Sequence, residues 1–387
     1  MVRSLKSTGG NSNGASIEPI KGYFRTKNIL YVSSGRAALW LILKALSQIK
    51  PKKNEVILPA YTCPAVASSI LKAGLKPVLC DINLNDFGFK TENLRLKIGE
   101  NTLAVIVVYL FGYPTNIEEV KKNCCEKGVF IVEDAAQAFG NTVADSRENR
   151  LGLIGDAGFF SFGRGKPVSV LHGGLLVTSS NEIFGRAQEI YWDLHGPVRF
   201  ANFKYGLALS SYKLFSNPYL YWIPQRIPSL HLGETIFEPE FRTSQGLRSA
   251  ASLLMEMTES IEKEKGIRRD NSRWYFSHFQ QITYIQNPEN GDFPYLRYPL
   301  FIKNRMLRDK LLEKLISQGT GAALFYPCPL NELGGLKDIL QDSDTYPSAK
   351  EISDRMITLP VHSGVTQSIR QKIKFIIENA IVNELPV

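Results

Sequence analysis

Cysteine is scarce in this chain, and its distribution excludes the two kinds of site that cysteines usually form. The 387 residues include five cysteines, an odd number. Their spacing fits neither a zinc site nor a disulfide framework. This pattern is typical of a protein from a reducing compartment, and it gives no reason to expect a bound metal. The cysteines are Cys63, Cys80, Cys124, Cys125 and Cys328.

Long hydrophobic runs are also missing. None approaches the roughly 18 apolar residues that a membrane-spanning helix requires, and the best, from Leu103 to Phe111, is typical of a buried strand. Residues 1–16 lack the apolar core of a signal peptide. Residues 1–24 begin with a Ser-, Gly- and Asn-rich stretch, which predicts a flexible arm. We therefore expect a cytoplasmic protein without a transmembrane segment.

Acidic residues are outnumbered by basic ones, which gives a formal net charge of +9 and a pI near 9.1. Such a surplus favours anionic partners. No stretch of Lys and Arg is dense enough for a nucleic-acid-binding arm, so we expect a phosphorylated small molecule and no nucleic acid. A solvated basic surface would account for the same charge.

Short apolar runs alternate with segments of helical periodicity along the first half of the chain. The runs EVILPAYT, KPVLCDI, LAVIVVYLFG and VFIV have the length of strands, and helical segments stand between them at 64–73 and 116–127. This alternation predicts an α/β fold in which helices cover both faces of a parallel sheet. Further on, we expect one long helix at 244–265, a strand at 295–302, and helices at 304–317 and 367–384.

Asp134 and Lys166 are expected to face one crevice. The apolar run 129–132 ends at two carboxylates, and the run 157–162 precedes the lysine. In an open parallel sheet, ligands bind outside the carboxyl ends of the strands. A lysine amine forms a Schiff base with an aldehyde, and a carboxylate keeps a pyridine nitrogen protonated. On spacing alone, a buried ion pair or two unrelated surface charges explain the two residues more simply.

Two glycine-containing segments are candidates for phosphate binding. Gly35 and Arg36 open a segment of helical periodicity, and a helix N-terminus is a ready anion site, although an ordinary helix cap gives the same pattern. Residues 163–166 look like part of a nucleotide P-loop. However, Phe160 replaces the first glycine of that motif and Pro167 replaces its Ser or Thr, which excludes the motif.

In chain order, these features resemble the DegT/DnrJ/EryC1/StrS family of pyridoxal-phosphate-dependent sugar aminotransferases of fold type I. The resemblance covers residues 28–380 and includes SSGRAAL, VEDAAQAFG, GDAGFFSFGRGK, FYPCPL and RMITLPVHSGVT. It implies a mainly parallel, seven-stranded sheet in a large domain and a small α+β domain. The corresponding division is an arm at 1–24, a PLP-binding domain at 25–240, and a linking helix with the small domain at 241–387.

The resemblance also implies roles for individual residues. Lys166 matches the lysine that bonds to pyridoxal 5'-phosphate and moves protons, and Asp134 matches the aspartate on the pyridine nitrogen, so these two are the expected catalytic residues. Gln137 matches a residue that contacts the ring. Family members that remove a sugar hydroxyl typically carry histidine at the lysine position, so Lys166 favours transamination. The residues expected to bind the cofactor are Gly35, Arg36, Cys63, Asp134, Gln137, Ser161, Lys166 and Asn202.

Three positions depart from the family pattern. Cys63 stands where an aromatic ring often stacks on the cofactor, and Tyr61 is an alternative source of a ring contact. His172 lies in the usual Gly-Glu-Gly-Gly segment, where it is either a site group that titrates near neutrality or a structural histidine. Asn202 matches only loosely the asparagine that reaches the phosphate of the neighbouring subunit.

An aromatic segment from Leu194 to Gly233 contains no Asp or Glu. One interpretation is a patch for a membrane surface or a lipid-linked substrate. The other is an insertion, at about 205–240, that packs over the active site or against a partner subunit. We favour the second interpretation because no amphipathic helical period runs through the segment.

Taken with the resemblance, the sequence predicts a homodimeric aminotransferase. It is expected to move an amino group from an amino acid, with glutamate as the expected donor, to a nucleotide-linked keto-sugar. Such a reaction belongs to the synthesis of cell-surface polysaccharides or of sugars in secondary metabolites. Two alternatives remain open: a PLP-binding sugar dehydratase, and a non-catalytic sensor or regulator with the same fold.

Overall fold

A seven-stranded sheet is the largest element of the computed structural model, which describes residues 18–143, 150–215 and 235–382. The strand order is β1-β7-β6-β5-β4-β2-β3. β7 runs antiparallel to its neighbours β6 and β1, and the other pairs are parallel, which confirms the predicted mainly parallel sheet. The strands are Ile29–Val32 (β1), Glu55–Pro59 (β2), Lys76–Cys80 (β3), Thr102–Val108 (β4), Phe130–Asp134 (β5), Ala157–Ser161 (β6) and Gly174–Thr178 (β7).

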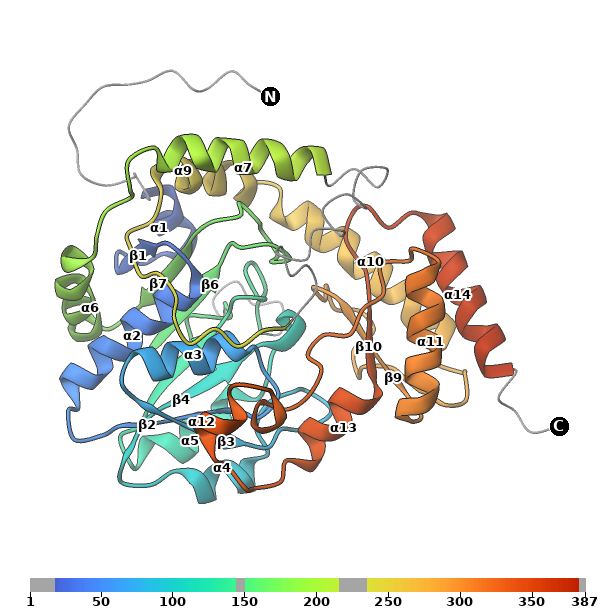
Figure 1. Cartoon of the computed structure of the whole chain (residues 1–387), viewed down its shortest axis with the longest axis horizontal. Coiled ribbons are helices and arrows are strands. Elements are labelled where there is room, and N and C mark those ends of the chain that lie inside the picture. The colour runs from blue at the N-terminus through green and yellow to red at the C-terminus, as the bar shows by residue number, and fades with distance from the viewer. Residues whose placement is uncertain (1–17, 144–149, 216–234, 383–387) are drawn as a thin grey trace.

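Helices cover both faces of this sheet, as the alternating pattern predicts (Figure 1). One face is covered by α2 (Gly35–Ile49), α3 (Pro64–Lys72) and α6 (Asn181–Asp193). The opposite face packs against α1 (Glu18–Phe24), α4 (Thr91–Lys97), α5 (Ile117–Cys125) and α9 (Arg248–Thr258). Every residue of β4 is buried, as expected for a central strand that is covered on both sides.

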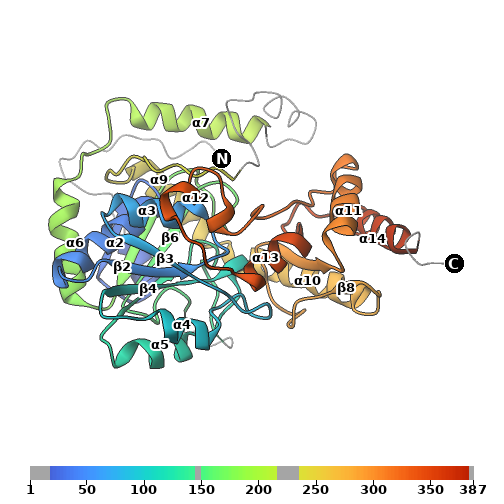
Figure 2. The ribbon, with the colours of Figure 1, turned by 60° about the horizontal axis from the view of Figure 1, so that its bottom comes forward.

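A second, three-stranded antiparallel sheet lies beside the large one (Figures 1 and 2). Its order is β10-β9-β8, and its strands are Ile285–Gln286 (β8), Tyr298–Ile302 (β9) and Met356–Leu359 (β10). The helices of this part are α11 (Arg305–Ser317), α13 (Pro347–Arg355) and α14 (Gln367–Val382), whereas the short α12 (Lys337–Leu340) lies near α3 of the large part (Figures 1 and 2). The division of the chain at residue 241 remains a prediction.

The expected long helix at 244–265 is wrong in its extent, because the chain forms two helices there. α9 ends at Thr258, and α10 (Ile261–Phe279) begins after Ser260. The Ser260 hydroxyl and backbone N–H both donate to the carbonyl of Met257, at 2.9 and 3.2 Å. Such a local side-chain bond competes with the regular helical ladder, and it marks the break.

Side chains of α10 donate hydrogen bonds to loops that adjoin both sheets. Lys265 donates to the Gly140 carbonyl at 2.8 Å, and Arg268 donates to the Pro167 carbonyl at 3.1 Å. Farther along the helix, two more side chains reach the segment that follows β10: Asn271 binds the Val361 carbonyl at 2.9 Å and Tyr275 binds the Pro360 carbonyl at 3.1 Å. The helix thus fixes the small sheet relative to the loop that carries Lys166.

Two segments at the margins of the fold differ from expectation. Within the predicted arm, residues 18–24 form α1, which buries Ile20 and Phe24; residues 1–17 lie outside the described part. Within the acid-free segment, residues 201–215 form α7 (Ala201–Phe215), and residues 216–234 lie outside it. In the described ranges, no helix combines the length and the hydropathy needed to cross a membrane.

Candidate active site

Asp134 lies at the carboxyl end of β5 and is almost fully buried. Its Oδ1 accepts the N–H of Ala136 at 3.0 Å, whereas Oδ2 accepts no hydrogen bond from the residues that the structure describes. Burial raises the pKa of this carboxyl, and the Lys166 cation and the Ala136 N–H oppose that rise. The sequence-predicted acid and lysine therefore interact electrostatically in one place.

Lys166 lies in the loop between β6 and β7 and is half-buried. It forms no ion pair with a carboxylate of the described chain, so the simple Asp–Lys ion pair that the spacing allowed is not present. The adjacent carbonyl of Pro167 accepts a hydrogen bond from the buried Arg268. This bond fixes the backbone next to Lys166, whose amine makes no hydrogen bond or ion pair with the described residues.

Gly35 and Ser161 lie side by side, as expected for two parts of one phosphate site. α2 begins at Gly35, and Ser34 caps it by accepting the Ala37 N–H at 3.1 Å. A Cβ on Gly35 would lie 2.6 Å from Ser161 Cβ and 3.0 Å from Ser161 Oγ. Only glycine permits this approach, which places the serine hydroxyl at a helix N-terminus, where anions are favoured.

The side chain of Arg36 has a partner that the sequence pattern does not reveal. Its Nη1 lies 2.6 Å from Glu238 Oε2, and its guanidinium stacks 5.1 Å from the ring centre of Phe241. The positive charge of Arg36 is therefore engaged by a carboxylate. Its predicted contribution reduces to the backbone N–H in the first turn of α2, where such groups lack intrahelical acceptors.

Gln137 lies in the loop after β5 and contacts Phe111 and Tyr326. Its Oε1 accepts the N–H of Phe111 at 2.9 Å, and its Nε2 lies 3.5 Å from the Tyr326 hydroxyl. Phe111 is buried and has a φ of 57°, a conformation that a bulky residue seldom adopts. Gln137 therefore stabilises the strained backbone at Phe111 with the same side chain that is predicted to contact the cofactor ring.

Tyr326 belongs to the site although it was not among the predicted residues. Its backbone N–H and carbonyl both bind the Tyr61 hydroxyl at 3.1 Å, and its ring lies edge-on to that of Tyr61. Burial raises its pKa, and the Cys63 thiol and the Asp134 carboxylate raise it further. Tyr61 thus positions Tyr326, and Cys63 lies beside the Tyr326 hydroxyl. The motif FYPCPL was the available signal for this residue.

His172 is partly buried beside Tyr205. Burial lowers its pKa, its Nδ1 has no hydrogen-bond partner in the described chain, and its ring lies 6.2 Å from that of Tyr205. Its carbonyl accepts the Tyr31 hydroxyl at 3.2 Å. These contacts favour the structural interpretation of His172.

Asn202 is not brought to the other predicted residues within this subunit. It lies in the first turn of α7, is exposed, and accepts the Ser249 hydroxyl at 2.9 Å. A role across a subunit interface stays a prediction.

Glu133, the neighbour of Asp134, has a structural role that the sequence did not reveal. Its side chain is fully buried, and it accepts four hydrogen bonds of 2.6–2.7 Å. Burial raises its pKa, and the four donors oppose that rise. It ties the loop before β6 to the sheet. The donors are the Tyr109 hydroxyl and the N–H groups of Gly152, Ile154 and Gly155.

Replacing Glu133 with glutamine is expected to lower the free energy of unfolding by about 3 kcal/mol. The amide keeps the shape of the side chain, but its NH₂ group must face N–H donors, which leaves buried groups unpaired. Denaturant unfolding measures the loss. The exposed Glu126 provides a control, because Glu126→Gln should change stability by no more than about 0.5 kcal/mol. An equally small effect of Glu133→Gln would contradict this role.

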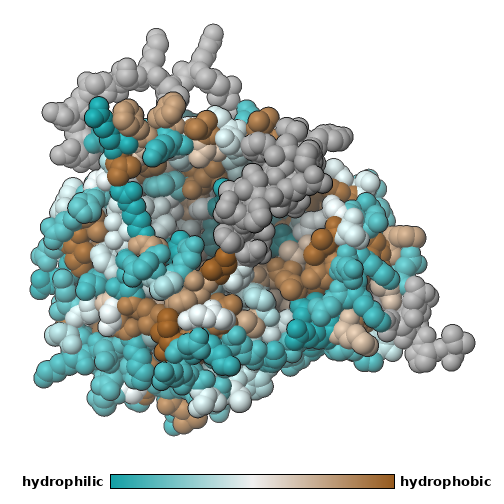
Figure 3. All heavy atoms as spheres, viewed as in Figure 1, coloured by the Kyte–Doolittle hydropathy of each residue, from teal (hydrophilic) through white to brown (hydrophobic). Residues whose placement is uncertain are grey.

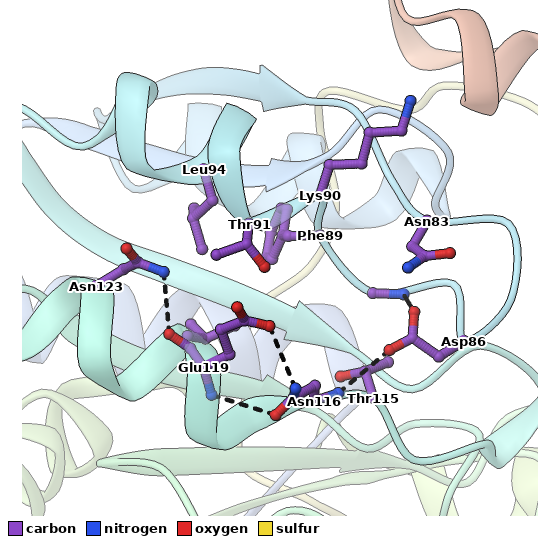
Figure 4. Close-up of a pocket in the computed structure, with 12 residues that line it drawn as sticks. Asn83, Asp86, Phe89, Lys90, Thr91, Leu94, Thr115, Asn116, Glu119 and Asn123 are labelled. Carbon is purple, nitrogen blue, oxygen red and sulfur yellow. Dashed lines mark hydrogen bonds between the residues drawn. The ribbon is translucent and has the colours of Figure 1, made fainter.

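A separate pocket of about 120 Å³ lies between α4 and α5 (Figure 4). None of the predicted site residues lines it. Its carboxylates bind neighbouring groups of the pocket wall: Asp86 accepts the Gly88 N–H at 3.0 Å, and Glu119 accepts Asn116 Nδ2 at 3.2 Å. In the described residues, no group of three or more His, Cys, Asp or Glu side chains is arranged to hold a metal.

Comparison with known families gives one match over most of the chain. The DegT/DnrJ/EryC1/StrS aminotransferase family matches residues 3–214 and 248–377. The interruption lies between α7 and α9 and includes the residues from 216 to 234 that the structure leaves undescribed.

Individual relatives cover nearly the whole chain at low identity. A UDP-N-acetyl-3-dehydro-alpha-D-glucosamine 3-aminotransferase of Acidithiobacillus ferrooxidans is 24% identical over 96% of this chain and 89% of its own length. A GDP-4-keto-6-deoxy-D-mannose 3-dehydratase of Escherichia coli O55:H7 is 24% identical over 76% and 73%. Among solved structures, the Helicobacter pylori aminotransferase PseC superimposes with a TM-score of 0.74 at 20% identity, over 95% of this chain and 90% of that one.

Proposed function

Because the chain belongs to the DegT/DnrJ/EryC1/StrS aminotransferase family, we propose that it transfers an amino group from glutamate to a nucleotide-linked keto-sugar. The protein is a pyridoxal-phosphate-dependent aminotransferase of fold type I. The observation that carries the proposal is the buried Asp134 carboxylate at the carboxyl end of β5, whose pKa is lowered by the charge of the Lys166 amine against the rise that burial causes.

The residues present fit pyridoxal phosphate at both of its ends. One oxygen of Asp134 is left without a donor in the described chain, as required of a carboxylate that accepts from a protonated ring nitrogen. At the other end, Ser161 meets Gly35 at the first turn of α2, and such a turn attracts phosphate. We propose that Ser161 and the backbone at Gly35 and Arg36 hold the phosphate, with Gln137, Cys63 and Tyr326 beside the ring.

When bound, the cofactor acts as an electron sink for a carbanion at the substrate carbon. Lys166 would then move a proton to and from that carbon through Nζ, since its amine is close enough to Asp134 to lower the pKa of that carboxyl. Asp134 would hold a proton on the ring nitrogen of the bound cofactor. Phe111, Phe325 and Tyr326 would exclude water from one side of the site. The ring centres of Phe111 and Phe325 lie 4.6 Å apart, and those of Phe325 and Tyr326 lie 4.4 Å apart.

Amino transfer is favoured over dehydration by the identity of residue 166. Lysine offers an amine that can react with a carbonyl. Family members that remove a sugar hydroxyl typically carry histidine at this position instead. In amino transfer, the CH–NH₂ of glutamate becomes a carbonyl, and the carbonyl of the keto-sugar becomes CH–NH₂, so that no other oxidant or reductant is consumed. Dehydration would instead remove a hydroxyl from the sugar. We also propose that the enzyme works as a homodimer.

Product analysis tests this proposal. The purified protein with pyridoxal phosphate, glutamate and a panel of nucleotide-linked keto-sugars should yield 2-oxoglutarate and an aminated nucleotide sugar in equal amounts, as measured by mass spectrometry. A product that has lost a hydroxyl, without gain of nitrogen, would establish the dehydratase. Binding of cofactor with no 2-oxoglutarate from any sugar would favour the sensor. Light scattering during size-exclusion chromatography would show whether the active species is a dimer.

Replacing Gly35 with alanine should weaken cofactor binding at least about tenfold and destabilise the fold by about 1–3 kcal/mol. The new methyl group would overlap Ser161, which belongs to an interior strand and cannot easily retreat. Titration with pyridoxal phosphate and denaturant unfolding measure both effects. Gly185→Ala is the matched control, because nothing lies within 4 Å of a Cβ there. Unchanged affinity in the Gly35 variant would contradict the phosphate assignment.

A further inference from the structure

Helix α7 carries apolar side chains on two opposite sides. Tyr205 and Leu209 face the protein: Tyr205 is buried and donates to the Val170 carbonyl at 2.8 Å, and Leu209 packs against the core. On the other side stand Phe203, Leu207 and Leu214, here called the outer stripe. Their spacing of four and seven residues places them on one side of a helix. Apolar residues on opposite faces cancel the amphipathic signal, which explains why the sequence predicted no helix here.

The outer stripe is exposed far beyond what a core-facing residue shows. Phe203 is 72% exposed, Leu207 61% and Leu214 55%, and the preceding Phe200 is 64% exposed. Figure 2 shows α7 along the outer edge of the molecule, and Figure 3 shows apolar residues in its neighbourhood at the top of the view. Several large apolar side chains exposed along one side of a helix are typical of an interaction site.

The segment that carries the stripe has charges of one sign. Between residues 194 and 233 the sequence contains no Asp or Glu, and Arg199, Lys204 and Lys213 flank the stripe. None of these three pairs with a carboxylate of the described chain. Arg199 instead lies 5.1 Å from the ring centre of Phe200. Phenylalanine and leucine bordered by unpaired cations are the composition of helices that lie in the interface of an anionic membrane.

We propose that α7 docks this enzyme on an anionic lipid surface, with the outer stripe in the acyl boundary and Arg199, Lys204 and Lys213 at the phosphate headgroups. A second copy of the chain fits the stripe less well. A twofold contact would bring each patch against itself, and its cations would face equal cations without an acid to neutralise them. The contact with the bilayer is peripheral. This inference does not depend on the substrate proposed above.

Vesicle cosedimentation of the full-length enzyme tests the proposal. The enzyme should sediment with vesicles of phosphatidylcholine mixed with phosphatidylglycerol, remain in solution with phosphatidylcholine alone, and be released as salt rises. The double variant Phe203→Ser/Leu207→Ser should lose at least about tenfold in partitioning, and Lys204→Glu/Lys213→Glu should lose binding to the anionic vesicles. Phe375, 67% exposed on α14, gives the control Phe375→Ser, which should bind like the unmodified enzyme.

The outcomes that overturn the proposal are distinct. Failure to sediment with anionic vesicles would mean that another part of the chain or a second copy covers the stripe. Equal binding of the Phe203/Leu207 double variant and the Phe375 control would show that the outer stripe does not contact the vesicles. Analytical ultracentrifugation that shows a dimer dissociating only in the stripe variant would make α7 a subunit interface. Thermal unfolding checks that all variants fold, and formation of 2-oxoglutarate is measured separately.

Discussion

Replacing Lys166 with alanine is expected to reduce amino transfer by more than about 10⁴-fold. The variant loses both the amine that can react with a carbonyl and the group that moves a proton at the substrate carbon. Steady-state formation of 2-oxoglutarate measures the loss, and the visible absorption of bound cofactor should shift at the same time. Cofactor should still bind, because Ser161 and Gly35 at the phosphate end are untouched.

Two further substitutions separate the chemistry of Lys166 from its charge. Lys166→Arg keeps a cation near Asp134, but a guanidinium stays protonated and cannot act as a nucleophile. We expect it to be as inactive as the alanine variant. Arg164, which is exposed in the same loop, provides the control, and Arg164→Ala should keep activity within about twofold. Substantial turnover by Lys166→Arg would show that only the positive charge of residue 166 matters. It would contradict the role of the Lys166 amine as nucleophile and proton carrier.

The part of the site that lies at strand ends could be predicted from the sequence. Asp134 is the last residue of β5 and Ser161 is the last residue of β6, and each strand contains a short apolar run that the sequence shows. The topology of a parallel sheet then places such ends along one edge. Local patterning therefore accounts for why Asp134 and Lys166 come close enough for the lysine charge to lower the pKa of the carboxyl.

The contacts between distant parts of the chain could not be predicted in this way. Tyr326, in a loop that follows a backbone bridge to β10, lies near the Gln137 amide although the two residues are far apart in the sequence, and no local period encodes that contact. Arg36 is neutralised by Glu238, which stands about 200 residues later. Glu133 and Asp134 are adjacent and chemically alike. The pleat of β5 sends neighbouring side chains to opposite faces of the sheet. As a result Glu133 binds the loop before β6, whereas Asp134 lies in the candidate site.

Replacing Asp134 with asparagine should lower turnover by about 10²–10⁴-fold while cofactor still binds. The amide keeps the size of the side chain and removes the negative charge that would hold a proton on the ring nitrogen. Measuring kcat for amino transfer together with the affinity for pyridoxal phosphate separates the two effects. Asp193→Asn, at an exposed carboxylate, serves as the control and should stay within about twofold. Near-normal turnover of the Asp134 variant would contradict the assignment.

Stability should respond in the opposite direction to activity. Burial is the main influence on Asp134 and raises its pKa above the usual 3.8, so the folded protein binds this proton more tightly than the unfolded chain does. The group therefore favours folding below pH 3.8, and that contribution is lost as pH rises through the raised pKa. The asparagine variant cannot lose it. In the cofactor-free protein, its unfolding free energy relative to that of the unmodified enzyme should increase from acidic to neutral pH. A difference independent of pH would show that Asp134 titrates normally, as a solvated surface carboxylate does.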